Sequence, residues 1–160
     1  MRSSIFLLLG SNLGNKLFYL KQACIAIDEE IGKVLQSSKI YETDAWGIED
    51  QPSFLNQVIE VSSSLTPHQI LEKINTLERT IGRIRHGKWG SRVIDIDILY
   101  DGSESIQSKD LTIPHPQIQN RRFTLVPLCE LDPNFIHPIL KRSNQDLLDT
   151  CKDSLEVRIF

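Results

Sequence analysis

Residues 88–98 read KWGSRVIDIDI and are the most informative stretch of the chain. Its isoleucines alternate with Asp95 and Asp97, and β-branched residues at alternate positions are typical of a strand with one buried face. Because alternate residues of a strand point to the same side, the two carboxylates share the opposite face, about 6 to 7 Å apart. Carboxylates at this spacing can bind hard divalent ions, and Mg²⁺ is the usual ion where phosphate completes the shell. Two solvated aspartates on an exposed sheet face are the alternative.

A basic segment precedes the acidic pair. It contains four cationic residues, a histidine and a tryptophan: Arg83, Arg85, His86, Lys88, Trp89 and Arg92. Arginine binds phosphate oxygens through two parallel N–H groups, and an indole can cover a nucleotide base. Alone, the segment could be a solvated loop with a surface tryptophan. Next to paired carboxylates it indicates a site for a metal-bound polyphosphate, because such a ligand needs cations for its oxygens and acids for its ions.

The composition indicates one globular domain, residues 1–160, in a reducing cytoplasm. Hydrophobic residues make up 40% of the chain, which is enough for a sizeable core at this length. The net charge of −3 disfavours nucleic-acid binding through a broad basic field, so the basic segment must act locally. The three cysteines form no C-x-x-C pair, and their odd number argues against a disulfide framework. The apolar run at 5–9 is too short to span a membrane and is predicted to be a buried strand.

Hydrophobic periodicity and turn residues divide the first hundred residues into six elements. We predict strands at 5–9, 36–42, 54–63 and 93–99 and helices at 17–31 and 67–81. The second helix has the clearest start, because Thr66, Pro67 and Gln69 match its N-cap, first and third positions. The order β-α-β-β-α-β is that of α+β ferredoxin-like folds, with an antiparallel sheet covered by helices on one face. The other face is then left for function, and a C-terminal extension follows from residue 101, with a short helix near 122–131.

The acidic strand and its basic segment closely resemble the signature of 6-hydroxymethyl-7,8-dihydropterin pyrophosphokinases. Further motifs match in the family's order along most of the chain: Gly10-Ser11-Asn12, Gln51-Pro52, Phe54-Leu55-Asn56, Glu78 to Arg83, Ile113-Pro114-His115-Pro116 and Asn120 to Phe123. The resemblance implies the ferredoxin-like fold and transfer of the β,γ-pyrophosphoryl group of ATP to the pterin hydroxymethyl oxygen, which leaves AMP. It also implies ATP as co-substrate and two Mg²⁺ ions. We expect a monomer that acts on these small molecules, with neither nucleic acid nor a membrane as partner.

The same resemblance implies roles for particular residues. The metal ligands are Asp95 and Asp97, and the catalytic residues are Arg83, Arg92 and Asp97. The ATP contacts come from the second helix, the basic segment and the region after the acidic strand: Asn75, Glu78, Arg83, Arg85, Lys88, Trp89, Arg92, Ile98, Thr112, His115 and Arg121. The pterin contacts comprise two phenylalanines around the flat ring and polar groups at its edge: Thr43, Asp44, Trp46, Phe54, Asn56, Asp95 and Phe123.

Several of these residues have other interpretations on the sequence alone. Phe54 and Phe123 are typical core residues, and Asn56 within an apolar strand could mark a turn or a bulge. His115 lies between two prolines and could cap a turn. The turn at 10–14 matches no phosphate-binding loop and is interpreted as a connection from strand to helix.

The chain departs from the family pattern in its basic segment and near His115. Lys88 stands where many members have arginine, and a lysine lacks the bidentate fork, so this position predicts a weaker grip on the nucleotide. The basic segment is one residue shorter than in some relatives, and Pro116 replaces an aromatic residue of some members. Two other function classes stay open. A metal-dependent phosphohydrolase or nuclease would use the same acids with water as nucleophile. A non-catalytic ferredoxin-like regulatory or RNA-binding domain fits less well, because RNA-binding sheets display aromatics where this strand displays acids.

Overall fold

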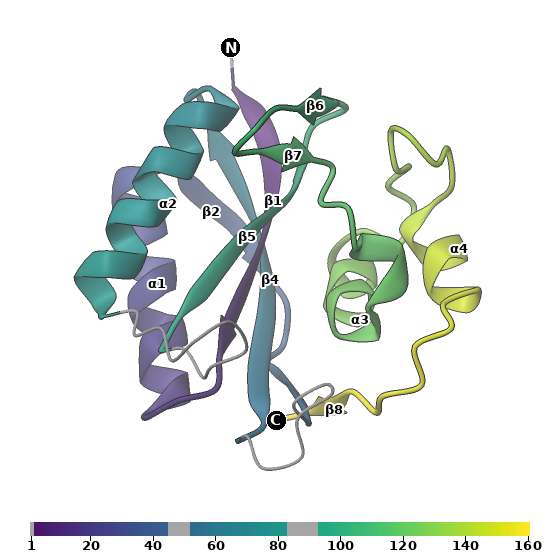
Figure 1. Ribbon diagram of the computed structural model, residues 1–160, viewed down its shortest axis with the longest axis horizontal. Coiled ribbons are helices and arrows are strands. Elements are labelled where there is room, and N and C mark those ends of the chain that lie inside the picture. The colour runs from purple at the N-terminus through teal and green to yellow at the C-terminus, as the bar shows by residue number, and fades with distance from the viewer. Residues whose placement is uncertain (1, 45–51, 83–92) are drawn as a thin grey trace.

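The computed structural model describes residues 2–44, 52–82 and 93–160. Its centre is an antiparallel sheet in the order β5-β1-β4-β3-β8, with β2 also paired to β4 (Figure 1). The strands of this sheet are β1 (Ser3–Ser11), β2 (Lys33–Ser37), β3 (Tyr41–Thr43), β4 (Phe54–Ser63), β5 (Asp95–Asp101) and β8 (Arg158–Ile159). A separate pair, β6 (Ile106–Gln107) and β7 (Thr112–Ile113), follows β5. Within the described ranges, no helix is long and apolar enough to cross a membrane.

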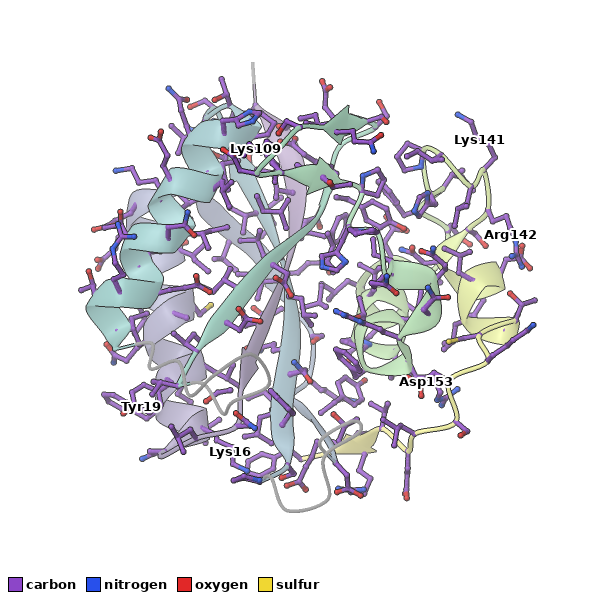
Figure 2. The ribbon with its side chains drawn as sticks, in the orientation of Figure 1. Lys16, Tyr19, Lys109, Lys141, Arg142 and Asp153 are labelled. Carbon is purple, nitrogen blue, oxygen red and sulfur yellow. The ribbon has the colours of Figure 1, made fainter. Side chains whose placement is uncertain are left out.

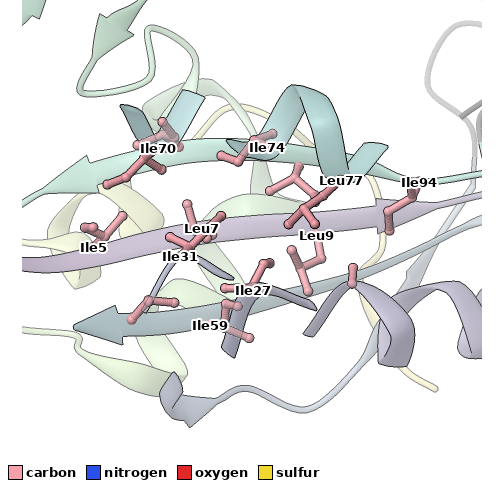
Figure 3. Close-up of a cluster of buried hydrophobic side chains, with 14 of the residues drawn as sticks. Ile5, Leu7, Leu9, Ile27, Ile31, Ile59, Ile70, Ile74, Leu77 and Ile94 are labelled. Atoms are coloured by element: carbon pink, nitrogen blue, oxygen red, sulfur yellow. The ribbon is translucent and has the colours of Figure 1, made fainter. Parts of the chain in front are cut away.

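Two helices, α1 (Lys16–Glu30) and α2 (Pro67–Ile81), cover one face of the sheet (Figure 1). α2 begins as predicted, because the Thr66 hydroxyl accepts from Gln69 N at 3.2 Å and Gln69 Oε1 accepts from Thr66 N at 2.9 Å. It ends at Gly82, whose φ of 104° lies in the left-handed region that favours glycine. Aliphatic side chains from both helices and from β1, β4 and β5 form a continuous core between helices and sheet (Figure 3). The predicted α+β ferredoxin-like fold is confirmed.

The predicted strand at 36–42 is corrected to two short strands. β2 and β3 both pair with the long strand β4, and Ser38 lies between them. The Ser38 N–H donates to Val58 O at 2.8 Å, and its hydroxyl accepts from Val58 N at 3.0 Å. A serine side chain that takes a place in the backbone ladder interrupts the regular pairing. The sequence pattern of apolar residues gave no sign of this long-range contact.

The face that was expected to be left for function is partly covered by the C-terminal extension. The 3₁₀ helix η1 (Ile118–Asn120), α3 (Arg122–Leu131) and α4 (Asn144–Asp149) lie on this side (Figure 1). A second, smaller core joins Phe6, Leu8 and Val58 of the sheet to α3 and α4. Tyr100 fastens the extension, because its hydroxyl donates to Asn144 Oδ1 at 2.8 Å.

β5 changes phase at Leu99. The isoleucines of this strand face the core under α1 and α2, as predicted. Leu7 of β1 pairs with Ile98 and Phe6 pairs with Tyr100, so that Leu99 is an extra residue in β5. Such a bulge turns two successive side chains to one side of the sheet. Leu99 and Tyr100 therefore both join the second core.

Candidate active site

A row of small and polar residues crosses three adjacent strands on the α3 side of the sheet. Asn56 of β4 pairs with Gly10 of β1, and Gly10 pairs with Asp95 of β5. In the next row, toward the second core, Asp97 lies opposite Leu8. Directly opposed residues of neighbouring strands share a face, so Asn56 and both carboxylates are presented on one surface. This arrangement confirms that the acids lie opposite the isoleucine face.

The Asn56 amide lies over the glycine at the centre of this row. A Cβ atom at position 10 would be 2.8 Å from Asn56 Nδ2, closer than real Cβ atoms approach other groups. Asn56 is buried, and its Nδ2 donates to Leu9 O at 3.3 Å. Its pairing with β1 is in regular register, which corrects the interpretation of this asparagine as a turn or bulge. The absence of a side chain at Gly10 provides the space for the amide.

Asp95 and Asp97 offer two partly buried carboxylates from one strand as candidate metal ligands. Among the residues that the structure describes, there is no group of three or more His, Cys, Asp or Glu side chains that could hold a metal ion. Proteins usually bind Mg²⁺ through one or two carboxylates, with phosphate oxygens and waters as the other ligands. The pair therefore fits an ion that arrives with a polyphosphate, rather than a metal held in an all-protein cage.

Glu78 supports the acidic strand from α2. Its side chain is 3% exposed, and Oε2 accepts from Ile96 N at 2.9 Å. Ile96 lies between the two aspartates on β5, which is an edge strand of the main sheet. Glu78 thus satisfies a backbone N–H at this edge and fixes the strand at the point where the acids leave it. The family resemblance implied a nucleotide contact for this residue, and the structure gives it a buried contact with the backbone.

His115 lies against the same strand and is neutral near pH 7. Its backbone N–H donates to Leu99 O at 3.0 Å, and its ring Nδ1 accepts from the backbone N–H of Gln117 at 3.1 Å. Burial, followed by the positive charge of Arg121, lowers the pKa of His115 to about 4, although Asp95 acts in the opposite direction. Because Nδ1 is an acceptor, the ring proton is on Nε2. The Nε2–H is a donor suited to a phosphate oxygen.

Arg121 and Phe123 stand at the start of α3. The guanidinium carbon of Arg121 lies 5.6 Å from the centre of the Phe123 ring, within cation–π range. Phe123 is half-buried at the margin of the second core, so one part of its ring packs and the other is accessible. The pair places a cation suited to phosphate beside an aromatic surface suited to a flat ring.

The remaining described pterin candidates lie on β3 and at the start of β4. Tyr41 pairs with Asn56 and Thr43 pairs with Phe54, which continues the polar row by one strand. Thr43 is buried and Phe54 is half-buried. Asp44 is exposed, and its Oδ1 accepts from Arg158 Nη2 at 3.3 Å. Phe54 and Asn56 are alternate residues of β4 and therefore share a face.

A cavity of about 210 Å³ borders the edge of β5. Two implied ATP contacts, Ile98 and Thr112, line it together with Asp97 and His115. Asn75 is exposed on α2, one turn beyond Leu71, which also lines the cavity. Six predicted site residues lie outside the described residues, and their roles stay predictions: Trp46, Arg83, Arg85, Lys88, Trp89 and Arg92.

The segment predicted as a turn at 10–14 is more than a connection from strand to helix, and its first two residues, Gly10 and Ser11, belong to β1. The Ser11 hydroxyl donates to Val93 O, two residues before β5. Asn12 is buried, and its Nδ2 donates to Pro52 O at 3.4 Å, two residues before β4. Gly10, Ser11 and Asn12 therefore join the beginnings of the two strands that carry the site. The sequence contained one signal for this role, because these small and polar residues directly continue an apolar strand.

Comparisons with known proteins converge on one family. A family model for 7,8-dihydro-6-hydroxymethylpterin-pyrophosphokinase matches residues 6–133. The 2-amino-4-hydroxy-6-hydroxymethyldihydropteridine pyrophosphokinase of Aquifex aeolicus is 43% identical over 142 residues, which cover 88% of this chain and 87% of the relative. The Bacillus subtilis protein of the same name is 40% identical over 132 residues, which cover 82% and 79%.

Solved structures share the fold at much lower identity. A Plasmodium falciparum HPPK-DHPS structure superimposes with a TM-score of 0.76 and 18% identity over 92% of this chain. An HPPK-DHPS structure in complex with substrates gives a TM-score of 0.80 and 15% identity over 93% of this chain. This chain spans 43% of each of those longer chains. At such identities the likeness supports the fold alone.

Proposed function

The chain belongs to the 7,8-dihydro-6-hydroxymethylpterin-pyrophosphokinase family, and we propose that it transfers pyrophosphate from ATP to 6-hydroxymethyl-7,8-dihydropterin in folate biosynthesis. The pterin hydroxymethyl oxygen attacks the β-phosphorus, the bond to the α-phosphate oxygen breaks, and AMP leaves. One observation carries the proposal: Asp95 and Asp97 share a sheet face with Asn56, on the side of the sheet where Phe123 packs against the second core.

ATP is proposed to bind along the edge of β5. When bound with ATP, two Mg²⁺ ions would neutralise phosphate charge and place the reacting oxygens, with Asp95 and Asp97 as their protein ligands. His115 donates from Nε2 to a phosphate oxygen, and Arg121 adds a positive charge beside it. The cavity wall formed by Ile98 and Thr112 accommodates part of the nucleotide.

The pterin is proposed to bind where the polar row meets α3. Phe54 and Phe123 would enclose the flat bicycle, and the Asn56 amide would hydrogen-bond its edge. The backbone at Thr43 and Asp44 would meet the remaining polar atoms of the ring. Since the Asp95 carboxylate lies in the same row as Asn56, the hydroxymethyl group would point toward the metal ligands.

The basic segment completes the proposed site on the strength of the family resemblance. Arg83 and Arg92 would stabilise the negative charge of the transferred group, while Arg85, Lys88 and Trp89 would hold the nucleotide. Trp46 is likewise proposed as a pterin contact on the family resemblance alone. Asn75 completes the proposed nucleotide contacts from α2, and Glu78 is proposed to act indirectly by fixing Ile96 between the two acids. We further propose that the protein acts as a cytoplasmic monomer on these two small molecules.

The products of ATP turnover test the proposal directly. We expect the protein, incubated with MgATP and the reduced pterin, to form AMP and the pterin diphosphate in equal amounts, and to form neither when the pterin is left out. Chelation of Mg²⁺ by excess EDTA should stop the reaction. Formation of ADP, or loss of ATP without pterin, would instead support a phosphohydrolase. Light scattering during gel filtration checks the monomeric state.

A further inference from the structure

The C-terminal strand β8 covers the outer edge of β3. Ile159 pairs with Tyr41 and Arg158 pairs with Glu42, and the Phe160 N–H donates to Ile40 O at 2.9 Å. β3 is a three-residue strand, at the short end of the usual range, and β4 and β8 pair with it on its two sides. β8 therefore stabilises the strand that leads into the proposed pterin contacts at Thr43 and Asp44.

Arg158 connects the two acidic residues on either side of Thr43. Its Nη2 lies 3.3 Å from Asp44 Oδ1 and 3.8 Å from Glu42 Oε1, and its Nη1 lies 4.0 Å from Glu156 Oε2. These three carboxylates would repel one another without the guanidinium between them. Arg158 thus fixes the side chain of Asp44 and leaves the backbone of that residue to the substrate.

Glu42 extends the same set of contacts to the beginning of β4 and to α1. Glu42 Oε2 accepts from the Ser53 hydroxyl at 2.7 Å, and Lys16 Nζ donates to Ser53 O at 2.9 Å and to its hydroxyl at 3.1 Å. Ser53 directly precedes Phe54. A continuous polar chain, Lys16–Ser53–Glu42–Arg158–Asp44, therefore holds both the end of β3 and the beginning of β4.

This polar chain lies on the face of the sheet opposite to the proposed pterin site. Glu42 pairs with Leu55, which belongs to the core under α1 and α2. Tyr41 points to the other side, where its hydroxyl donates to Glu130 of α3 at 2.6 Å. Because successive residues of a strand alternate between faces, Arg158 and Glu42 cannot reach a ligand beside Asn56. They can act on such a ligand only through the backbone of β3.

We propose that Arg158 is a positioning residue for the pterin site: from the reverse face of the sheet it bridges Glu42 and Asp44 and sets the position of Thr43 and Asp44. The inference rests on the proposed function, since it concerns the substrate of that same site. If Arg158 has this role, the affinity for the pterin depends on this residue of β8, and the affinity for ATP does not. The contacts are partly exposed ion pairs, so the expected effect is moderate and sensitive to salt.

Kinetics of three single variants test this role. We expect Arg158→Met to raise the KM for the pterin about threefold to fivefold while the KM for MgATP changes less than about twofold. Arg158→Lys keeps the charge and should recover most of the loss. Arg142→Met is the matched control, because Arg142 also forms a partly exposed pair, with Asp146 at 2.7 Å. Figure 2 shows Arg142 beside α4, across the molecule from Lys16. This control should leave the KM for both substrates unchanged.

Two further measurements separate positioning from a general loss of stability. The difference between wild type and Arg158→Met should shrink at about 1 M salt, where exposed ion pairs are screened. The effects of Glu42→Gln and Arg158→Met should be less than additive in the double variant, because both act through one contact. An unchanged pterin KM in Arg158→Met, or equal rises for pterin and ATP, would overturn the inference while wild type still forms AMP. If wild type forms no AMP, the proposed function fails, and this inference fails with it.

Discussion

The two faces of the sheet differ in how far the apolar core extends along strand β1. Under α1 and α2, aliphatic side chains line β1 from Ile5 to Leu9 without a break. On the α3 side, the second core includes Phe6 and Leu8 but ends at Gly10, where Asn56 and Asp95 take over. The same strand therefore contributes to a closed core on one face and to a polar site on the other.

Within a single strand, residues on one face therefore contribute to folding stability and residues on the other contribute to the site. A buried aliphatic residue under α1 or α2 should affect folding and leave the site intact. A residue on the α3 side should affect both, because α3 carries Phe123 and packs against the strands that present the acids. Variants on the two faces therefore test whether folding and substrate binding are separated in this way.

Loss of either acid should nearly abolish turnover. We expect Asp97→Ala and Asp95→Ala to lower kcat by about 10³-fold, the scale of losing one preorganised contact to the reacting charges. Thermal unfolding should be little changed, since neither carboxylate is a core contact. The control is Asp149→Ala, which removes an exposed acid on α4. Substantial activity of both site variants at ordinary Mg²⁺ concentrations would contradict the metal assignment.

A matched pair of core truncations should distinguish the two faces. Leu20 on α1 and Leu128 on α3 are both fully buried helical leucines, so Leu20→Ala and Leu128→Ala should each lower the free energy of unfolding by about 3 kcal/mol. Only Leu128→Ala should also weaken pterin binding, because it loosens the helix that carries Phe123. Denaturant unfolding and pterin titration measure the two effects. Equal pterin affinity in both variants would show that α3 packing does not hold the site.

The polar row should determine pterin affinity. Asn56→Ala leaves polar ring atoms of the pterin without a partner and should weaken binding by about 1 to 3 kcal/mol. Gly10→Ala should act in the same direction, because its Cβ would lie 2.8 Å from Asn56 Nδ2 and displace the amide. Calorimetric titration with the pterin measures both variants, and the affinity for MgATP serves as the internal control. Pterin affinities equal to that of wild type in both would place the pocket elsewhere.

The contact between β3 and α3 should have a small, pH-dependent effect. Burial, together with the Glu130 carboxylate, raises the pKa of Tyr41 to about 12. An unfolded tyrosine loses its proton near pH 10, so the unfolded state binds fewer protons than the folded state between about pH 10 and 12. This contribution to stability is therefore complete below pH 10 and is lost as the pH rises through that window. Tyr41→Phe should unfold more easily by about 1 kcal/mol at pH 8 and show a shallower decline above pH 10.

Much of the fold could be predicted from local patterns. The capping box at Thr66 and the alternation of isoleucines with Asp95 and Asp97 depend on neighbouring residues, and both are confirmed. The break between β2 and β3 could not be predicted, because it depends on a contact between Ser38 and Val58, twenty residues apart. Packing of the C-terminal extension on the second face was missed for the same reason.

The sequence predicted which residues form the candidate site, but not how they contact one another. Its acids and aromatics were identified from spacing and family resemblance, and the structure brings Asn56, Asp95, His115 and Phe123 to one side of the sheet. The contribution of Gly10 was missed, because a glycine shows its importance only through the group that lies over it. The contact of Glu78 with the backbone of β5 likewise requires the two elements to be seen together.

The bulge at Leu99 has a consequence for how this protein can diverge. It divides β5 into two segments with opposite phase. In residues 95–98, the site aspartates alternate with core isoleucines, whereas Leu99 and Tyr100 both pack against the C-terminal extension. Substitutions of Asp95 and Asp97 are constrained by the reaction, whereas those of Ile96, Ile98, Leu99 and Tyr100 are constrained by packing. Loss of Leu99 would remove the bulge and leave Tyr100 opposite Phe6 in a regular ladder, so its hydroxyl could still donate to Asn144, and the second core would lose one leucine. The seven-residue strand therefore carries its acids before the bulge and the anchor of the C-terminal extension after it.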